Sequence, residues 1–355
     1  MDKSRISHPL LALIIKTYGT IGVQFLSFSN HNLINWLINI LIDVFTYYLM
    51  FMGETSIITI RQSRIISSDR LLLIYYSDIN SRFIFPTICI SYMLSFFIRG
   101  SKIIELIDSL NRLRSIHQQR MSYSKASLIL IATFLANNLI VLVSFTTDML
   151  FESDRKSSIK STAGILLMTS FHTVTWLLFF IQQFLLCRIL EEIYHDRPSF
   201  PTMTYMTRIY QKIVNISEIN LQIQQEFSFL LLIHLLNATT YMIIAITYIT
   251  VYSKSNFGYW IEWPLRIIPW IYLCRINKNV MLHFDLIEKH LSNTGRHLKF
   301  YQCSKIHFRI KQLKIYKDRF QIIVYSSFKV DLSTLLFLVC FVTSYITIIY
   351  QTRKY

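Results

Sequence analysis

The last strongly apolar segment of the chain, residues 330–350, carries a regular stripe of mostly small and polar side chains. Recurring every three or four residues, these are Ser333, Phe337, Cys340, Ser344, Thr347 and Gln351. That spacing places them on one face of an α-helix. Hydroxyl and amide oxygens along such a face can replace part of the hydration shell of a passing ion. The same face could instead pack against a neighbouring helix, which also favours Ser, Thr and Cys.

The composition of the whole chain predicts a helical protein embedded in a membrane. Its 355 residues are 53% hydrophobic with a mean hydropathy of +0.40, and only 16% are charged. A soluble domain of this length needs more polar surface, and the scarcity of Gly and Pro argues against a sheet. The net charge of +16 lies mainly in loops between apolar segments, so membrane orientation explains it and no nucleic-acid partner is expected.

Side chains that could perform catalysis or bind a metal do not cluster at suitable spacings. The five Cys residues form no zinc-site pattern, and the apolar segments hold no group of His, Asp or Glu with helical spacing. We therefore expect neither an enzyme, nor a cofactor, nor a metal site.

A spanning helix needs about 20 mostly apolar residues, and seven segments approach that requirement. We predict transmembrane helices at about 33–52, 83–98, 128–150, 164–187, 229–252, 261–282 and 330–350. The sixth is the weakest, because it contains Arg266, Arg275 and Lys278. The predicted organisation is a cytosolic N-terminal segment 1–32, six helices within 33–284, cytosolic anchor helices in 285–329, and the seventh helix with a short extracellular tail in 330–355.

The distribution of basic residues sets the predicted orientation. With the N-terminus inside and the C-terminus outside, the inside segments carry more than twice as many Lys and Arg residues as the outside ones. The inside segments 188–225 and 285–329 also contain apolar residues at helical spacing. We expect the membrane helices to continue into the cytosol and pack there as a collar. Separate helices on the inner leaflet are the alternative.

The end of the chain resembles the terminal signature of insect gustatory receptors, which reads Thr-Tyr, five mostly apolar residues and Gln-Phe. This chain has Ser344-Tyr345 and Gln351-Thr352 at the same spacing, and Thr352 in place of Phe departs from the pattern. Upstream, Phe328-Lys-Val-Asp331-Leu-Ser-Thr-Leu resembles the family's Phe-x-x-Asp-x-x-Leu at the start of its last helix. The terminal motif is moderately specific, and the rest of the chain agrees in pattern more than in identity.

The resemblance implies a ligand-gated, non-selective cation channel in the plasma membrane of sensory neurons. It implies a homo- or hetero-tetramer with related receptors, joined through the cytosolic helical extensions. The seventh helix of each subunit would line a central pore with Phe337, Cys340, Ser344, Thr347 and Gln351. By the same resemblance, Gln351 lies at the outer constriction and Tyr345 packs behind the pore helix.

The expected ligand is a small organic tastant, bound among the outer halves of helices 2 to 6. Aromatic side chains with a few polar groups suit such a ligand. The candidate binding residues are Asp148, His172, Trp176, Tyr241, Tyr248 and Trp263. The same aromatics could instead pack the helices together or mark the membrane interface. Sugar-sensing members of the family have an acidic residue after the motif Tyr, whereas this chain has Ile346, which favours bitter or other compounds.

Two other receptor classes have seven helices. An insect odorant receptor shares the topology and the pore helix, but the spacing of Tyr345 and Gln351 favours a gustatory receptor. A rhodopsin-like G-protein-coupled receptor would need an extracellular N-terminus and an Asn-Pro-x-x-Tyr motif in its last helix, and that motif is missing from 330–350.

Overall fold

The structure is a computed structural model of the whole chain, and its described residues are 41, 44, 45, 48, 100–113, 155–196, 202–252, 257–296, 310–324 and 328–352. These residues are helical except for short connections and one small hairpin, which confirms the predicted all-α class. The second and third predicted spans lie outside the described residues, as does nearly all of the first.

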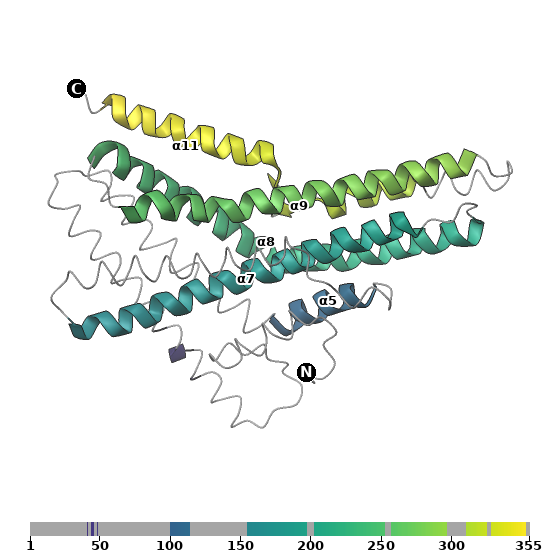
Figure 1. The fold of residues 1–355 in the computed structure, drawn as a ribbon, viewed down its shortest axis with the longest axis horizontal. Coiled ribbons are helices and arrows are strands. Elements are labelled where there is room, and N and C mark those ends of the chain that lie inside the picture. Colours follow the sequence, from purple (N-terminus) through teal and green to yellow (C-terminus); the bar gives the residue numbers. More distant parts are fainter. Residues whose placement is uncertain are drawn as a thin grey trace.

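Three long helices form the body of the bundle and lie along its longest axis (Figure 1). They are α7 (Arg155–His195), α8 (Met203–Tyr252) and α9 (Phe257–Arg296), with 41, 50 and 40 residues. Each contains one predicted span and continues beyond it as the same helix, with a length of about 60–75 Å at 1.5 Å per residue. Within the described ranges, no helix combines the length and the apolarity that a membrane crossing requires.

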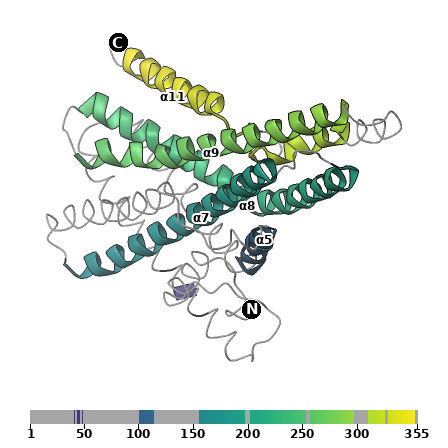
Figure 2. The same ribbon diagram turned by 45° about the vertical axis from the view of Figure 1, so that its right-hand side comes forward.

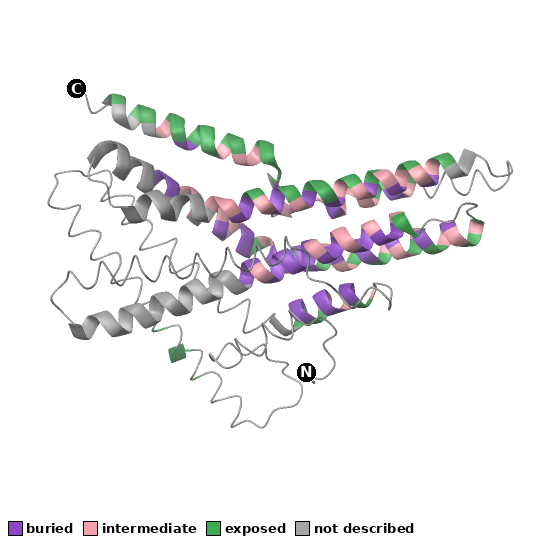
Figure 3. Ribbon diagram, in the orientation of Figure 1, coloured by how far each residue is buried: buried purple, intermediate pink, exposed green. Residues whose placement is uncertain are grey.

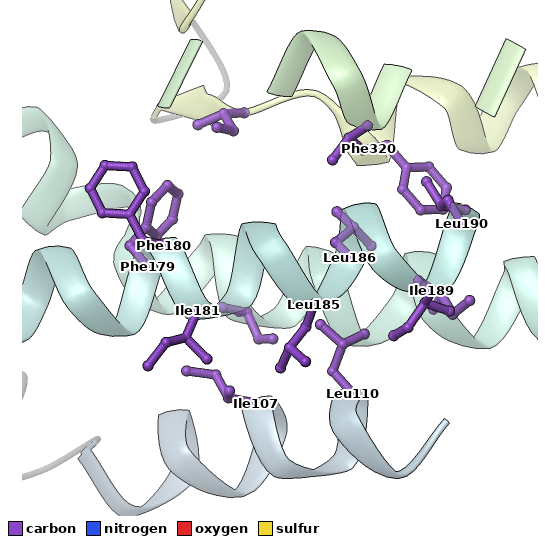
Figure 4. Packing of buried hydrophobic residues seen from close by; sticks show 14 of the residues in the cluster. Ile107, Leu110, Phe179, Phe180, Ile181, Leu185, Leu186, Ile189, Leu190 and Phe320 are labelled. Carbon is purple, nitrogen blue, oxygen red and sulfur yellow. The ribbon is translucent and has the colours of Figure 1, made fainter. Parts of the chain in front are cut away.

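A short amphipathic helix, α5 (Gly100–Arg112), closes one side of this bundle. Its apolar residues recur every three or four positions, and Ile103, Ile107 and Leu110 are fully buried. Figure 4 shows Ile107 and Leu110 beside Leu185 and the neighbouring apolar side chains of α7. Burying each such side chain contributes about 1.5–3 kcal/mol, so this stripe is sufficient to hold α5 on the long helices.

The segment before the last helix folds onto the same core. A helix over 310–317 leads into the 3-10 turn η4 (Asp318–Phe320), whose Phe320 packs against Phe284 of α9 with ring centroids 5.1 Å apart. Strands β1 (Ile323–Val324) and β2 (Phe328–Lys329) then pair antiparallel. The predicted anchor segment thus ends in a hairpin and not in a helix, because its β-branched run suits extended backbone better.

The last helix, α11 (Leu332–Thr352), begins two residues after the start of the segment 330–350. Asp331 precedes it, and its Oδ1 accepts a hydrogen bond from the backbone N–H of Thr334 at 2.8 Å. Its carbonyl accepts the N–H of Leu335 at 3.2 Å. This is an N-cap, which satisfies an amide that has no partner within the helix. Both views place α11 at the periphery of the bundle (Figure 1, Figure 2).

Candidate functional site

One face of α11 packs on the bundle. Val342 is fully buried with Met242 and Ile243 of α8, and Tyr345 packs against this cluster together with Ile267 of α9. Leu335 and Leu338, which are half-buried, lie on the same side of the helix. These four α11 positions are separated by three or four residues, so the packed face is one continuous stripe.

The predicted polar stripe lies on the opposite face of α11. At about 100° per residue, its members point on average half a helical turn away from Val342. All of them are exposed in the single chain: Ser333, Phe337, Cys340, Ser344, Thr347 and Gln351. Figure 3 shows this outer side of α11 as largely exposed. Among the described residues, the stripe therefore does not serve as a packing surface within its own chain.

Large apolar side chains flank the polar stripe on both sides. Leu332, Leu336 and Val339 lie along one edge, and Phe341 and Ile348 lie along the other. Each of the five is between 41% and 57% exposed. Contiguous exposed apolar surface of this kind marks a contact with another chain or with lipid. The outer side of α11 is thus divided into a polar centre and two apolar borders.

The hydroxyl groups of Thr343 and Thr347 on α11 leave their oxygen lone pairs free to accept hydrogen bonds. Thr343 Oγ1 donates to the Val339 carbonyl at 2.8 Å, and Thr347 Oγ1 donates to the Thr343 carbonyl at 2.9 Å. Since each hydroxyl proton is used within the helix, the oxygen lone pairs are the groups presented outward. The sequence of α11 contains no charged side chain. Oxygen atoms on an uncharged surface of this kind can replace part of the hydration shell of an ion.

The residues of the terminal motif have separate structural roles. Tyr345 lies on the packed face, behind the polar stripe, whereas Gln351 lies on the exposed face. Asp331 caps the helix, and the Thr334 hydroxyl lies 2.9 Å from its Oδ1 and 2.7 Å from the Lys329 carbonyl. The motif therefore fixes the start of α11 and the side that it turns toward the bundle.

Of the candidate ligand residues, Trp176 is the one whose side chain is described. It is 2% exposed and joins three helices through ring contacts. Its ring centroid lies 5.0 Å from Trp270 of α9 in an edge-to-face arrangement, 5.5 Å from His234 of α8 and 5.8 Å from Phe180. Edge-to-face aromatic pairs of this kind stabilise packing. Trp176 therefore belongs to an aromatic cluster that couples α7, α8 and α9.

The other candidate ligand residues are placed only in part. His172 lies on α7, Tyr241 and Tyr248 lie on α8, and Trp263 lies on α9, all at positions whose side chains are not described. Asp148 falls outside the described residues.

The sequence interpretation missed His234, which is 3% exposed in the aromatic cluster. The sequence carries a signal for this residue, because His234 lies within the predicted span 229–252 and an ionisable side chain at membrane depth is costly.

Titratable groups also meet where α7 and α9 pack together. Arg188 and Glu191 of α7 form an ion pair at 2.7 Å, and both act electrostatically on His283 of α9, together with His195. Burial is the largest influence on His283 and lowers its pKa below the ordinary value of 6.5, although Glu191 acts in the opposite direction. Burial thus favours the neutral form of this imidazole.

The fold and the site can be compared with known proteins. No protein-family model and no curated protein matches the sequence. Among solved structures, the insect olfactory receptor OR5 from Machilis hrabei matches with a TM-score of 0.72 and 13% sequence identity, covering 97% of each chain. The same receptor in complex with eugenol matches with a TM-score of 0.70 and 14% identity, covering 97% of this chain and 99% of that one. The chain thus has the fold of an insect olfactory receptor, the fold expected from its resemblance to the related gustatory receptors.

Proposed function

We propose that the chain is a subunit of a ligand-gated, non-selective cation channel that serves as an insect chemoreceptor. One observation carries this proposal: the polar stripe of α11 lies on the face opposite Val342 and is exposed along its whole length. Polar side chains on an otherwise apolar helix are unfavourable against lipid and favourable against water. A water-filled path beside α11 accounts for the stripe.

The apolar borders of the stripe fit an assembly around that path. In a closed ring of subunits, each α11 would turn its polar centre toward the axis and its borders toward lipid or the neighbouring α11 helices. We propose a homo- or hetero-tetramer in the plasma membrane of sensory neurons, with α11 as the pore helix. Gln351 then lies near the outer end of the pore, and Cys340 lies nearer its middle.

The ligand that we propose is a small organic compound that binds among α7, α8 and α9. The aromatic cluster around Trp176 would form one wall of the site, and His172, Tyr241, Tyr248 and Trp263 lie on the same helices. The spacing of Tyr345 and Gln351 in the sequence favours a gustatory receptor, and Ile346 favours bitter or other compounds over sugars as ligands.

An odorant receptor is the second candidate. The solved structures with the same fold are olfactory, and one of them is a complex with eugenol. The two candidates differ in ligand volatility, so they can be separated by testing volatile odorants, including eugenol, beside non-volatile bitter compounds on the same cells.

Patch-clamp recording in transfected cells tests the proposal. With G-protein turnover blocked by a non-hydrolysable GDP analogue, we expect a ligand from this panel to evoke a cation current. We expect Gln351→Ala to change the relative permeability of Na⁺ and Ca²⁺ by about twofold or more. Gln222→Ala, at an exposed position of α8, is the matched control and leaves permeability unchanged. Loss of all current under G-protein block contradicts the channel.

A further inference from the structure

Three buried amide side chains join α7, α8 and the turn that leads to α11. Gln182 Nε2 of α7 donates a hydrogen bond to Asn220 Oδ1 of α8 at 2.6 Å. Asn220 Nδ2 in turn donates to the backbone carbonyl of Arg319, in η4, at 2.7 Å. Gln224, one helical turn after Asn220, donates to the same carbonyl at 3.3 Å. Gln182 and Asn220 are completely buried.

Asn220 is the central member because it uses both ends of its amide group. Its Oδ1 accepts a hydrogen bond from α7, and its Nδ2 donates one to the Arg319 carbonyl. That carbonyl lies at the end of a 3-10 turn, where carbonyl groups lack a partner within the helix. A buried amide or carbonyl group without a hydrogen-bond partner is costly. These bonds therefore favour the one arrangement of α7, α8 and η4 in which all of them form. An apolar side chain at position 220 would leave the Arg319 carbonyl with only the longer bond to Gln224.

The carbonyl bound by Asn220 is linked to the start of α11 through buried side chains and one backbone hydrogen bond. Phe320 follows directly and is fully buried against Phe284, and Ile322 and Val324 are fully buried in the same core. The N–H of Val330 donates to the Ile322 carbonyl at 2.8 Å and closes the hairpin. Asp331 then caps α11. A displacement at Arg319 would therefore be passed through the buried side chains of Phe320, Ile322 and Val324 and the bond from Val330 to Ile322 toward the first turn of the helix.

The inner and outer parts of α11 are held differently. The inner end is fixed by hydrogen bonds through the hairpin and the Asp331 cap, whereas further along the helix Val342 and Tyr345 make apolar contacts with Met242, Ile243 and Ile267. We propose that Asn220 is a positioning residue that fixes the inner end of α11 relative to α7 and α8. Its consequence for gating rests on the proposed channel function: loss of this fixed point changes how often the channel opens without ligand.

Hydrogen exchange on the full-length receptor in lipid nanodiscs tests the positioning role without any ligand. The reporters are the backbone amides of Gln321, Val330 and Leu335, which donate within η4, the hairpin and the first turn of α11. We expect Asn220→Leu to raise exchange in peptides covering 318–335 roughly tenfold, the effect of losing one buried hydrogen bond.

Two further variants make the result specific. Gln182→Leu removes the link to α7 but keeps the bond from Asn220 to Arg319, so exchange in 318–335 stays within about twofold of wild type. Asn215→Leu makes the same substitution as Asn220→Leu, at an exposed position of α8, and leaves exchange unchanged. If Asn220→Leu yields no folded protein, Gln224→Leu removes the weaker donor and should raise exchange about threefold.

The outcomes separate a positioning residue from an ordinary core residue. An unchanged rate in 318–335, or an equal rise throughout α7 and α8, overturns the proposal. Recording in planar bilayers adds the functional test, in which Asn220→Leu should increase spontaneous opening several-fold relative to Asn215→Leu without changing the reversal potential. Spontaneous opening no higher than that of Asn215→Leu, in a wild-type receptor that conducts, also overturns it. A wild-type protein that never conducts would refute the channel, while the exchange result would still decide whether Asn220 positions α11.

Discussion

Cys340 and Val342 lie on opposite sides of α11, although a single residue separates them in the sequence. Val342 is fully buried against Met242, and the Cys340 thiol is free and exposed. Side-chain directions repeat regularly along an α-helix. The known directions of Cys340 and Val342 therefore give the direction of every other α11 side chain relative to the bundle. It also allows the environment of the polar stripe to be tested chemically.

A charged, water-soluble methanethiosulfonate reagent should modify Cys340 in the assembled receptor. If the stripe faces water, Cys340 reacts at least about tenfold faster than the buried Cys274, because the reaction requires access of solvent to a thiolate. Peptide mass spectrometry measures both rates in the same sample. Modification should also reduce the current, and Cys340→Ser should abolish that reduction. A Cys340 thiol that reacts no faster than Cys274 would indicate that the stripe faces lipid or protein.

Asp331→Ala should destabilise the first turn of α11. The substitution removes the acceptor for the Thr334 amide, and loss of an N-cap costs about 1 kcal/mol. Hydrogen exchange of the first turn measures the loss locally. Asp331→Asn is the matched control, because an Asn side chain also caps well and should retain most of the protection. Equal loss in both variants would show that the charge of Asp331, and not its capping bond, matters.

Leu185→Ala should reduce the stability of the receptor by about 2–5 kcal/mol. Leu185 of α7 is fully buried where α7 packs on α5 (Figure 4). Its truncation therefore removes buried apolar surface and leaves a cavity. Leu282→Ala on α9 makes the same chemical change at a side chain that is 55% exposed, and it should have a much smaller effect. Thermal unfolding of the receptor in nanodiscs compares the two. Similar losses would contradict the packing of α5 against α7.

Acidification should destabilise the receptor partly through His283. Because burial lowers the pKa of His283 in the folded state, the unfolded state binds the proton more tightly. Stability therefore falls as the pH drops through about 6.5 toward the lowered pKa, and it is restored above 6.5. We expect His283→Gln to reduce the decrease in melting temperature between pH 7.5 and pH 5.

The control for this pH dependence is Asn279→Gln, at an exposed position of α9 one helical turn before His283, which changes no titratable group. It should leave the acid-induced decrease in melting temperature close to that of the wild type. A decrease that is the same in His283→Gln and in the wild type would show that proton uptake by His283 does not contribute.

The features of this chain that can be read from the sequence share a local signal. The helical class follows from composition, and the start of α11 follows from Asp331, a residue that caps a helix through bonds to amides three and four positions away. The stripe from Ser333 to Gln351 is likewise a property of spacing within one helix. Each of these features depends on residues within a few turns of one another, so no knowledge of the fold is needed.

The direction of the polar stripe and the position of α11 were decided by the tertiary structure alone. Spacing could not distinguish packing of the stripe from its exposure to solvent, since both favour small polar residues. The contact of Val342 with α8 shows that, within the described part of the chain, the opposite face of α11 packs on the bundle. The bonds of Asn220 join positions 38 and 99 residues apart, at Gln182 and Arg319. Such pairs depend on how whole helices align side by side, and that alignment is set by the sum of many contacts and not by any local pattern.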